Sequence, residues 1–581
     1  MQSFLRFFAL PGLALVGLAF LWACSEDFLE VEPTGSLNQN VLANVDGVDG
    51  LLIGAYAQLN GRGNWFGGAS NWANGSIQGG DANKGTNDGD FTQINDLVRY
   101  QLSPTSQIPS DRWNALFEGV SRSNSVLTLL PIAGENDSRV AGQAGRLEGE
   151  ARFLRGHYYF SLKLAFDQAP ILTPGLTPTE QTEVPSTRDL WGFIEEDFMF
   201  AMNNLPETQS AVGRANKWAA AAYLAKTYIF QEKWGEARTL LNDIYANGVT
   251  AAGERYRLLD DYSQIFNADF DNHPESVFAV QSAVNLGNVN TGNPDFALNF
   301  PHNTGSTGPG NCCGFFQPSF DLANSFRTED GLPLPGTSYR EAGNELTTDQ
   351  GIAAADPYTV DDKPVDPRLD HSVGRRGIPY LGWGPHPGVS WIRDQPYAGP
   401  YSPKKFVYYA SQEGTLSDGS GWTRGYPAMN YNIIRFADVI LWLAEAEIQL
   451  GDLERGRELI NEVRSRAANE VNMIMLDDGS PAANYEISTY DASFASQQDA
   501  LDALMFERKL ELSGEGHRFF DLRRWGRAES FLNPFIDYEQ QYLPVAYDNA
   551  QFTAPQDLYY PIPQGQIDLQ GTDILQQNPG Y

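Results

Sequence analysis

The segment AKTYIFQEKWGEARTLLNDI at residues 225–244 has a related copy, AEAEIQLGDLERGRELINEV, at residues 444–463, and the two align without a gap. Each copy has the pattern of a helix, a short polar turn and a second helix. Trp234 in one copy and Leu453 in the other would fill the space at the turn, as in tetratricopeptide hairpins. Small residues that permit close helix contact recur at matched positions: Ala225 with Ala444, and Ala237 with Gly456. Two unrelated helical hairpins are the alternative interpretation.

Apolar residues spaced by three and four, the period of an amphipathic helix, also precede the first copy. We expect helices within residues 44–59, 113–130, 140–162 and 190–205. Pro131, Pro170 and Pro206 follow three of these segments. Each should end its helix, because proline cannot donate the next helical hydrogen bond.

Residues 265–425, between the two copies, are rich in Gly, Pro, Asn and Asp and contain only short apolar stretches such as SVFAV at 276–280. This composition favours long structured loops with a few small strands. The predicted fold is therefore mainly α, built on tetratricopeptide-like helical hairpins, with a long irregular loop-rich insertion and minor β structure. Loops of this length usually carry function, so we expect binding residues among them.

Charge and composition exclude several classes of function. The 581 residues include 40 Lys and Arg against 73 Asp and Glu, for a formal net charge of −33, which repels nucleic acid and disfavours a polyanionic ligand. The six His form no cluster with metal-ligand spacing, and no Cys or second His lies near His517. We therefore expect no metal site, no cofactor and no nucleophilic catalysis.

The N-terminus has the pattern of an export signal. Arg6 precedes an apolar run from Phe7 to Ala23, and Cys24 follows it, with Ser-Glu-Asp next. Residues 21–24 resemble a bacterial lipobox. We predict that residues 1–23 are a lipoprotein signal peptide and that Cys24 is lipidated. A signal peptide cut elsewhere and an uncleaved transmembrane anchor are the alternatives.

The two remaining cysteines, Cys312 and Cys313, are adjacent in a Gly-rich loop. In an oxidising exterior they can form a vicinal disulfide or remain two thiols, and the sequence leaves both open.

Several segments carry a family resemblance when taken in order. The most specific is ERKLELSGEGHRFFDLRRW at 507–525, and EARFLRGHYYF at 150–160, YPIPQ at 560–564 and QNPGY at 577–581 accompany it. Together they resemble the RagB/SusD family, from Cys24 to Tyr581. On this resemblance the chain divides into an N-terminal SusD-like helical region, 24–235, and a C-terminal RagB/SusD-like region, 236–581, which we expect to form one compact unit.

The resemblance implies a surface-exposed, lipid-anchored protein of the cell outer membrane. Such a protein binds an oligomeric nutrient, chiefly an oligosaccharide, and delivers it to a SusC-like TonB-dependent transporter without catalysing a reaction. A peptide-capturing member of the same family is one alternative. A glycan-cleaving enzyme and a tetratricopeptide-type adaptor for other proteins are two more.

The charged residues of the 507–525 segment could be read as paired catalytic carboxylates. Arginines alternate with these acids beside Phe519, Phe520 and Trp525, which favours a partly buried ion-pair network that fastens the last helix to the bundle. The residues of this structural network are Glu507, Arg508, Glu511, Glu515, Arg518 and Asp521.

A sugar ring has an apolar face and a rim of hydroxyls, so its binding site needs exposed aromatic rings with polar groups beside them. Five tryptophans lie in Gly-, Asn- or Pro-rich loops rather than on helical periods: Trp65, Trp72, Trp383, Trp391 and Trp422. A local hydrophobic plug is the alternative role for each. The ligand-binding residues that we predict are Trp65, Trp72, Asp81, Asn83, Phe315, Tyr380, Trp383 and Trp391, where Asp81 resembles an acidic position of the family.

Overall fold

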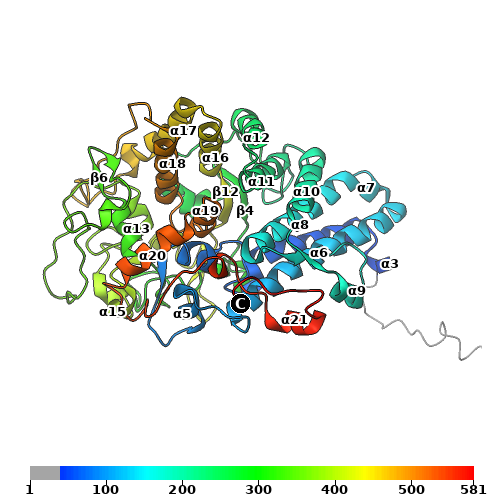
Figure 1. The fold of residues 1–581 in the computed structure, drawn as a ribbon, viewed down its shortest axis with the longest axis horizontal. Helices are drawn as coiled ribbons and strands as arrows, with labels where there is room; N and C mark the ends of the chain where they lie inside the picture. The colour runs from blue at the N-terminus through cyan, green and yellow to red at the C-terminus, as the bar shows by residue number, and fades with distance from the viewer. Residues whose placement is uncertain (1–38) are drawn as a thin grey trace, which may run out of the picture.

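The structure is a computed structural model and describes residues 39–581, so the predicted signal peptide and Cys24 lie outside the described residues. A row of helices, each packed on the next, forms the right and upper parts of the molecule in Figure 1. In chain order these helices are α4 (Val45–Ala57), α6 (Gln107–Asn136), α8 (Ala144–Phe166), α10 (Trp191–Asn204), α11 (Lys217–Ile229), α12 (Trp234–Asn247), α16 (Phe436–Gln449), α17 (Leu453–Ala467) and α18 (Gln497–Glu511).

The two sequence copies form the hairpins α11–α12 and α16–α17, which confirms the tetratricopeptide-like prediction. Ala225, Ala237 and Ala444 are fully buried between helices. A Cβ added to Gly456 would lie 2.3 Å from the side chain of Ile448, so only glycine permits this approach of α17 to α16. Because α12 packs against α16, the hairpins are neighbours in space although the insertion separates them in sequence.

The predicted helix ends are correct at Pro170 and Pro206 but wrong at Pro131, since α6 continues through this residue to Asn136. Leu129, Leu130 and Ala133 around it are buried, and their packing outweighs the lost hydrogen bond. Pro131 itself is exposed, so water can reach the carbonyl that lacks a helical donor.

The insertion begins and ends at one two-stranded ladder. β4 (Ser276–Val280) pairs antiparallel with β12 (Tyr431–Arg435), with Ser276 opposite Arg435 and Val280 opposite Tyr431. The remaining two-stranded sheets among the described residues are β1 (Ala82–Gly85) with β5 (Phe315–Pro318), β2 (Ala169–Pro170) with β3 (Ser186–Thr187), β6 (Thr328–Glu329) with β7 (Leu332–Pro333), β8 (Val373–Gly374) with β9 (Ser402–Pro403), and β10 (Ser417–Asp418) with β11 (Tyr426–Pro427).

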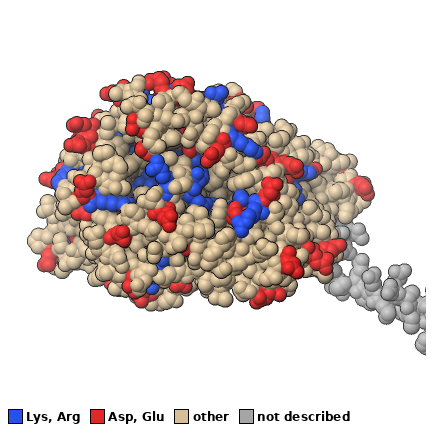
Figure 2. Space-filling model, in the orientation of Figure 1, with Lys and Arg blue, Asp and Glu red and all other residues tan. Residues whose placement is uncertain are grey.

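The remaining α-helices are short or lie near the C-terminus. They are α3 (Gln39–Leu42), α5 (Gln93–Val98), α7 (Ser138–Ala141), α9 (Pro178–Glu183), α13 (Phe320–Ser325), α14 (Leu369–Ser372), α15 (Gln395–Ala398), α19 (Arg518–Arg524), α20 (Ala528–Glu539) and α21 (Gln564–Gln570). On the face shown in Figure 2, Lys and Arg gather in a band across the middle, where α19 and α20 lie in Figure 1. None of the helices in residues 39–581 has the length and apolar character needed to span a membrane.

Candidate functional site

Three aromatic side chains from separate loops and one from β11 form one connected group, which we call the aromatic ridge: Trp65, Phe91, Trp422 and Tyr426. The ring centroids of Trp65 and Phe91 are 4.9 Å apart, those of Trp65 and Trp422 are 6.2 Å apart, and those of Trp422 and Tyr426 are 6.4 Å apart. Trp422 is 55% exposed, the most exposed ring of the group. Trp65 and Phe91 are half-buried and Tyr426 is 3% exposed, so Trp422 supplies most of the apolar ring surface that the ridge offers to a ligand from solvent.

Each loop of the ridge is positioned by local structure. Trp65 lies in the turn that follows the 3₁₀ helix Gln58–Gly63, and Phe91 lies between β1 and α5 with a φ of 45°, a conformation uncommon for a residue with a side chain. Trp422 lies in the loop between β10 and β11, and its Nε1–H donates a 2.9 Å hydrogen bond to the hydroxyl of Tyr426. The indole of Trp422 is therefore oriented by its own strand pair.

Two arginines that lie near residues of the ridge have carboxylate partners. Arg393 contacts the carboxylate of Asp90, next to Phe91, and donates a 2.9 Å hydrogen bond to Thr86 Oγ1. Arg424, two residues after Trp422, pairs with Glu413 and donates to the carbonyl of Gly308 at 3.1 Å. Arg393 and Arg424 thus have compensated charges, which suits a neutral polar ligand better than a strongly charged one.

Six of the eight predicted ligand-binding residues are buried, so in this structure they cannot contact a ligand from solvent. The exposed fractions are 1% for Trp72, Asp81, Asn83 and Tyr380, 0% for Phe315 and 4% for Trp391. Trp65 and Trp383 are half-buried and keep part of their surface exposed. For the buried six, the geometry corrects the expectation of direct contact, because loops distant in sequence fold over them.

Three of the six buried residues, Trp72, Asp81 and Asn83, instead make hydrogen bonds that hold the loops in place. Trp72 donates from Nε1 to the backbone oxygen of Trp65 at 2.6 Å. Asp81 accepts a 3.0 Å hydrogen bond from the backbone of Gly514, and burial raises the pKa of its carboxyl to about 6. Asn83 donates to the carbonyl of Ala398 at 2.9 Å. These contacts join β1 and the Trp65 turn to the rest of the fold.

Tyr380 and Trp391 belong to a small separate core beneath the loops of the insertion, which also contains Phe300, Val407 and Tyr408. The rings of Tyr380 and Trp391 are 5.5 Å apart in an edge-to-face arrangement. Trp383 packs on this core from outside, and its Nε1–H points to the carbonyl of Tyr408 at 3.4 Å. The hydrophobic-plug interpretation therefore describes Trp391 in this structure, and Tyr380 packs in the same core.

Trp422, although recognised as a loop tryptophan, is missing from the predicted set. The local sequence indicated its exposure, because Asp418-Gly-Ser-Gly-Trp422 contains no apolar side chain that could cover the indole.

Cys312 and Cys313, for which the sequence allowed either a disulfide or two thiols, form a vicinal disulfide. Phe315, on the strand that follows, contacts Phe91 with ring centroids 5.6 Å apart.

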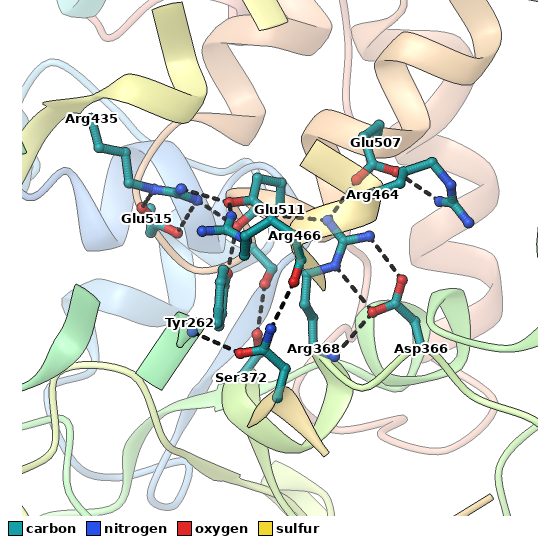
Figure 3. Close-up of polar contacts among 12 residues, drawn as sticks. Tyr262, Asp366, Arg368, Ser372, Arg435, Arg464, Arg466, Glu507, Glu511 and Glu515 are labelled. Carbon is teal, nitrogen blue, oxygen red and sulfur yellow. Dashed lines mark hydrogen bonds and ion pairs between the residues drawn. The ribbon is translucent and has the colours of Figure 1, made fainter. Parts of the chain in front are cut away.

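A buried ion-pair network, which we call the central network, joins α18 and the turn after it to α17, β12 and the insertion (Figure 3). Glu511 contacts three guanidinium groups, with distances of 2.9 Å to Arg368 and 2.6 Å to Arg435 and a further contact to Arg466. The wider network contains equal numbers of cations and carboxylates: Arg368, Lys405, Arg435, Arg464 and Arg466 with Glu275, Asp366, Glu507, Glu511 and Glu515.

Burial by itself would raise the pKa of the Glu511 carboxyl, but Arg466, Arg435 and Arg368 outweigh it and hold that pKa below its ordinary value. Glu507 and Glu511 are at most 1% exposed, and Glu515 is 2% exposed. Carboxylates buried against arginine and lysine side chains in this way are closed off from solvent, so their geometry is that of a structural network.

The partners of these acids differ from those that the sequence suggested. Within the 507–525 segment, Asp521 pairs with Arg508 at 2.9 Å and with Arg524 at 2.8 Å. The glutamates instead use arginines and a lysine from other parts of the chain. Arg518 stacks on the ring of Phe531 at 4.7 Å, and its Nε atom has no hydrogen-bond partner among the described residues.

The fold and the ridge together define a tetratricopeptide-like helical protein that carries a loop-built aromatic surface. The chain belongs to the SusD family: the profile described as "SusD family" matches residues 274–581, and one described as "Starch-binding associating with outer membrane" matches residues 27–229. A SusD-like protein of Bacteroides ovatus is 26% identical over 96% of this chain and 92% of its own length.

Solved structures share the fold. A SusD superfamily protein from Bacteroides vulgatus superposes with a TM-score of 0.66 at 21% identity, covering 94% of this chain and 99% of its own. A structure titled "Laminarin binding SusD-like protein" has a TM-score of 0.65 at 24% identity and covers 93% of this chain and 100% of its own. Similarity at this level of identity establishes the architecture.

Proposed function

We propose that this protein is a lipid-anchored, surface-exposed protein of the outer membrane that binds a neutral glycan and passes it to a SusC-like TonB-dependent transporter. The observation that carries the proposal is the aromatic ridge, in which the exposed indole of Trp422 lies beside Trp65. Such rings bind the apolar faces of sugars, and their polar surroundings can serve the hydroxyls. Membership of the SusD family and a relative titled as laminarin-binding support the choice of a glycan.

The surroundings of the ridge favour an uncharged ligand over a peptide with free charges. Arg393 and Arg424 each have a carboxylate partner, so neither presents an unpaired cation to a ligand. The surface of a protein with a net charge of −33 also gives no general attraction for an acidic polymer. Because the central carboxylates are sealed in ion pairs, binding without turnover is the role that we assign.

Binding can be tested by calorimetry with the wild-type soluble domain and a panel of malto-, laminari-, xylo- and manno-oligosaccharides. We expect saturable binding of at least one neutral oligosaccharide, with no released sugar and little dependence on salt concentration. A panel of neutral and charged oligopeptides serves as the comparison. Binding to peptides alone would replace the glycan by a peptide cargo, and product formation would make the protein an enzyme.

Delivery to a transporter requires a physical complex. Affinity purification of the full-length, tagged protein from detergent-solubilised outer membranes should recover a TonB-dependent barrel in stoichiometric amount. Recovery of the protein without such a barrel, under conditions that preserve other outer-membrane complexes, would contradict this part of the proposal.

A further inference from the structure

The turn that carries Trp65 is held by two buried polar side chains, Asp295 and Arg112, from opposite sides. Asp295, in the 3₁₀ helix Pro294–Phe296, accepts hydrogen bonds from both the backbone N–H of Ser70, at 3.3 Å, and its hydroxyl. Arg112 of α6 donates to the backbone carbonyls of Phe66, at 3.4 Å, and of Gly68. Arg112 also donates to Asn71 Oδ1 at 2.7 Å.

Both side chains are buried without an ion-pair partner. Asp295 is 3% exposed and Arg112 is 2% exposed, and among the described residues neither lies within ion-pair distance of an opposite charge. Because desolvation disfavours an isolated ion, burial raises the pKa of the Asp295 carboxyl to about 7 and lowers the pKa of the Arg112 guanidinium. Here the hydrogen bonds of both groups are directed at residues 66–71, the turn next to the ridge.

The backbone of the turn is fitted closely to the carboxylate. A Cβ added at Gly68 would lie 2.2 Å from Asp295 Oδ2, so only glycine can occupy that position. The amide of Ala69 also bonds the carbonyl of Leu59 at 2.9 Å, and Trp72 contacts the backbone oxygen of Trp65. The turn is thus connected to α6, to the Asp295 segment and to the preceding 3₁₀ helix.

We propose that Asp295 and Arg112 are positioning residues for ligand binding, which fix the turn so that Trp65 stands beside Trp422 before a ligand arrives. This inference rests on the proposed function of the ridge. Asp295 belongs to the insertion and Arg112 to the helical row, so the two sides of the molecule hold Trp65 in place between them. Preformed binding surfaces avoid the entropic cost of ordering a loop when the ligand binds.

Two measurements on the variants Asp295→Ala and Ser70→Ala test the inference. Hydrogen exchange should become faster at the backbone amides of residues 64–71 and remain unchanged in residues 225–244. Affinity for the best binder of the oligosaccharide panel should fall about tenfold in Asp295→Ala, since the loss of a buried hydrogen bond commonly changes an equilibrium constant by about that factor. Because Asp295 acts through Ser70, the double variant should bind no more weakly than Asp295→Ala.

Three controls separate the possible outcomes. Asp295→Asn retains an acceptor oxygen and should recover most of the affinity, whereas Asp573→Ala, at an exposed aspartate, should change neither measurement. If Trp65→Ala weakens binding but Asp295→Ala and Ser70→Ala do not, the positioning role is wrong, and the proposal that the aromatic ridge binds the ligand is retained. If Trp65→Ala has no effect on binding, the proposed site fails, and unchanged exchange in residues 64–71 of Asp295→Ala would independently overturn the positioning role.

Discussion

The indole N–H of Trp72 donates a 2.6 Å hydrogen bond to the backbone oxygen of Trp65, so a buried tryptophan supports a partly exposed one seven residues earlier. Trp72 also stacks on Phe66 with ring centroids 5.8 Å apart and meets Phe316 edge-on at 6.0 Å. The two tryptophans of one loop therefore have different roles, which mutation can separate.

Trp422→Ala should weaken glycan binding by about 1–3 kcal/mol, a typical loss for an aromatic contact residue, without lowering the melting temperature. Trp65→Ala should weaken binding to a similar extent. Trp72→Ala should instead destabilise the fold by about 3–5 kcal/mol, because it empties a packed site in the core. Calorimetry and thermal unfolding of the three variants check this prediction, and a Trp422 variant with full affinity would move the site elsewhere.

Glu511→Ala should lower the free energy of unfolding by about 3–5 kcal/mol, since it leaves Arg368, Arg435 and Arg466 without their shared carboxylate. The matched control is Glu458→Ala, which breaks the solvent-exposed pair with Arg455 at 2.9 Å and should cost less than about 1 kcal/mol. Urea unfolding measures both. Equal, small losses would mean that the central network contributes little to stability.

Arg518→Ala should be milder than Glu511→Ala, although both residues lie in the same sequence motif. Arg518 stacks on Phe531, and Arg518 has no ion pair within 4.0 Å among the described residues. The variant therefore loses packing and a longer-range attraction to Asp81 rather than a direct ion pair. A larger loss of stability than that of Glu511→Ala, in the same unfolding experiment, would show that the stack matters more than the ion pairs.

Stability should depend on pH through Glu539, a buried residue at the end of α20. Burial raises the pKa of its carboxyl to about 8 in the folded protein, above the ordinary value of 4.5. The proton is therefore bound more tightly by the folded state, so this contribution to stability is complete below about pH 4.5 and is lost as the pH rises through about 8. Each pH unit within this window changes the contribution by at most about 1.4 kcal/mol.

Glu539→Gln removes this titration, so its melting temperature relative to the wild type should rise between pH 6 and 8.5. Glu529→Gln, an exposed change on the same helix, is the control and should keep a constant offset from the wild type. A constant offset for Glu539→Gln as well would show that the buried carboxyl does not titrate in this range.

Cys24→Ser should release the protein from the outer membrane, because we predict that the lipid on this cysteine is its anchor. Fractionation and labelling of intact cells should find the wild type at the cell surface and the variant in the soluble fractions. A variant that still sediments with outer membranes and labels at the surface would reject the anchor.

The spacing of apolar residues by three and four predicted most of the helical scaffold. Each helix buries one face against its neighbour, and the residues of that face are close together in the sequence. The ligand surface depends on contacts between distant segments. Trp391 packs against Tyr380 and against His386, and the ring centroids of His386 and Trp391 are 5.3 Å apart. No local sequence pattern predicts this packing. Glu507 similarly accepts a hydrogen bond from Arg368 of the insertion, 139 residues away in sequence. The sequence therefore indicates that these side chains are important without naming their partners.

The antiparallel pairing of β4 with β12 has a consequence for how the protein diversifies. Because the excursion of residues 281–430 leaves and returns through one ladder, insertions and deletions within it leave the spacing of the two hairpins unchanged. Within the excursion, Asp366, Arg368 and Lys405 enter the central network, and Asp321 pairs with Lys509 of α18 at 2.6 Å, so these positions fasten it to the helices. Its loops away from such contacts can therefore change in length and sequence while the helical hairpins keep their arrangement.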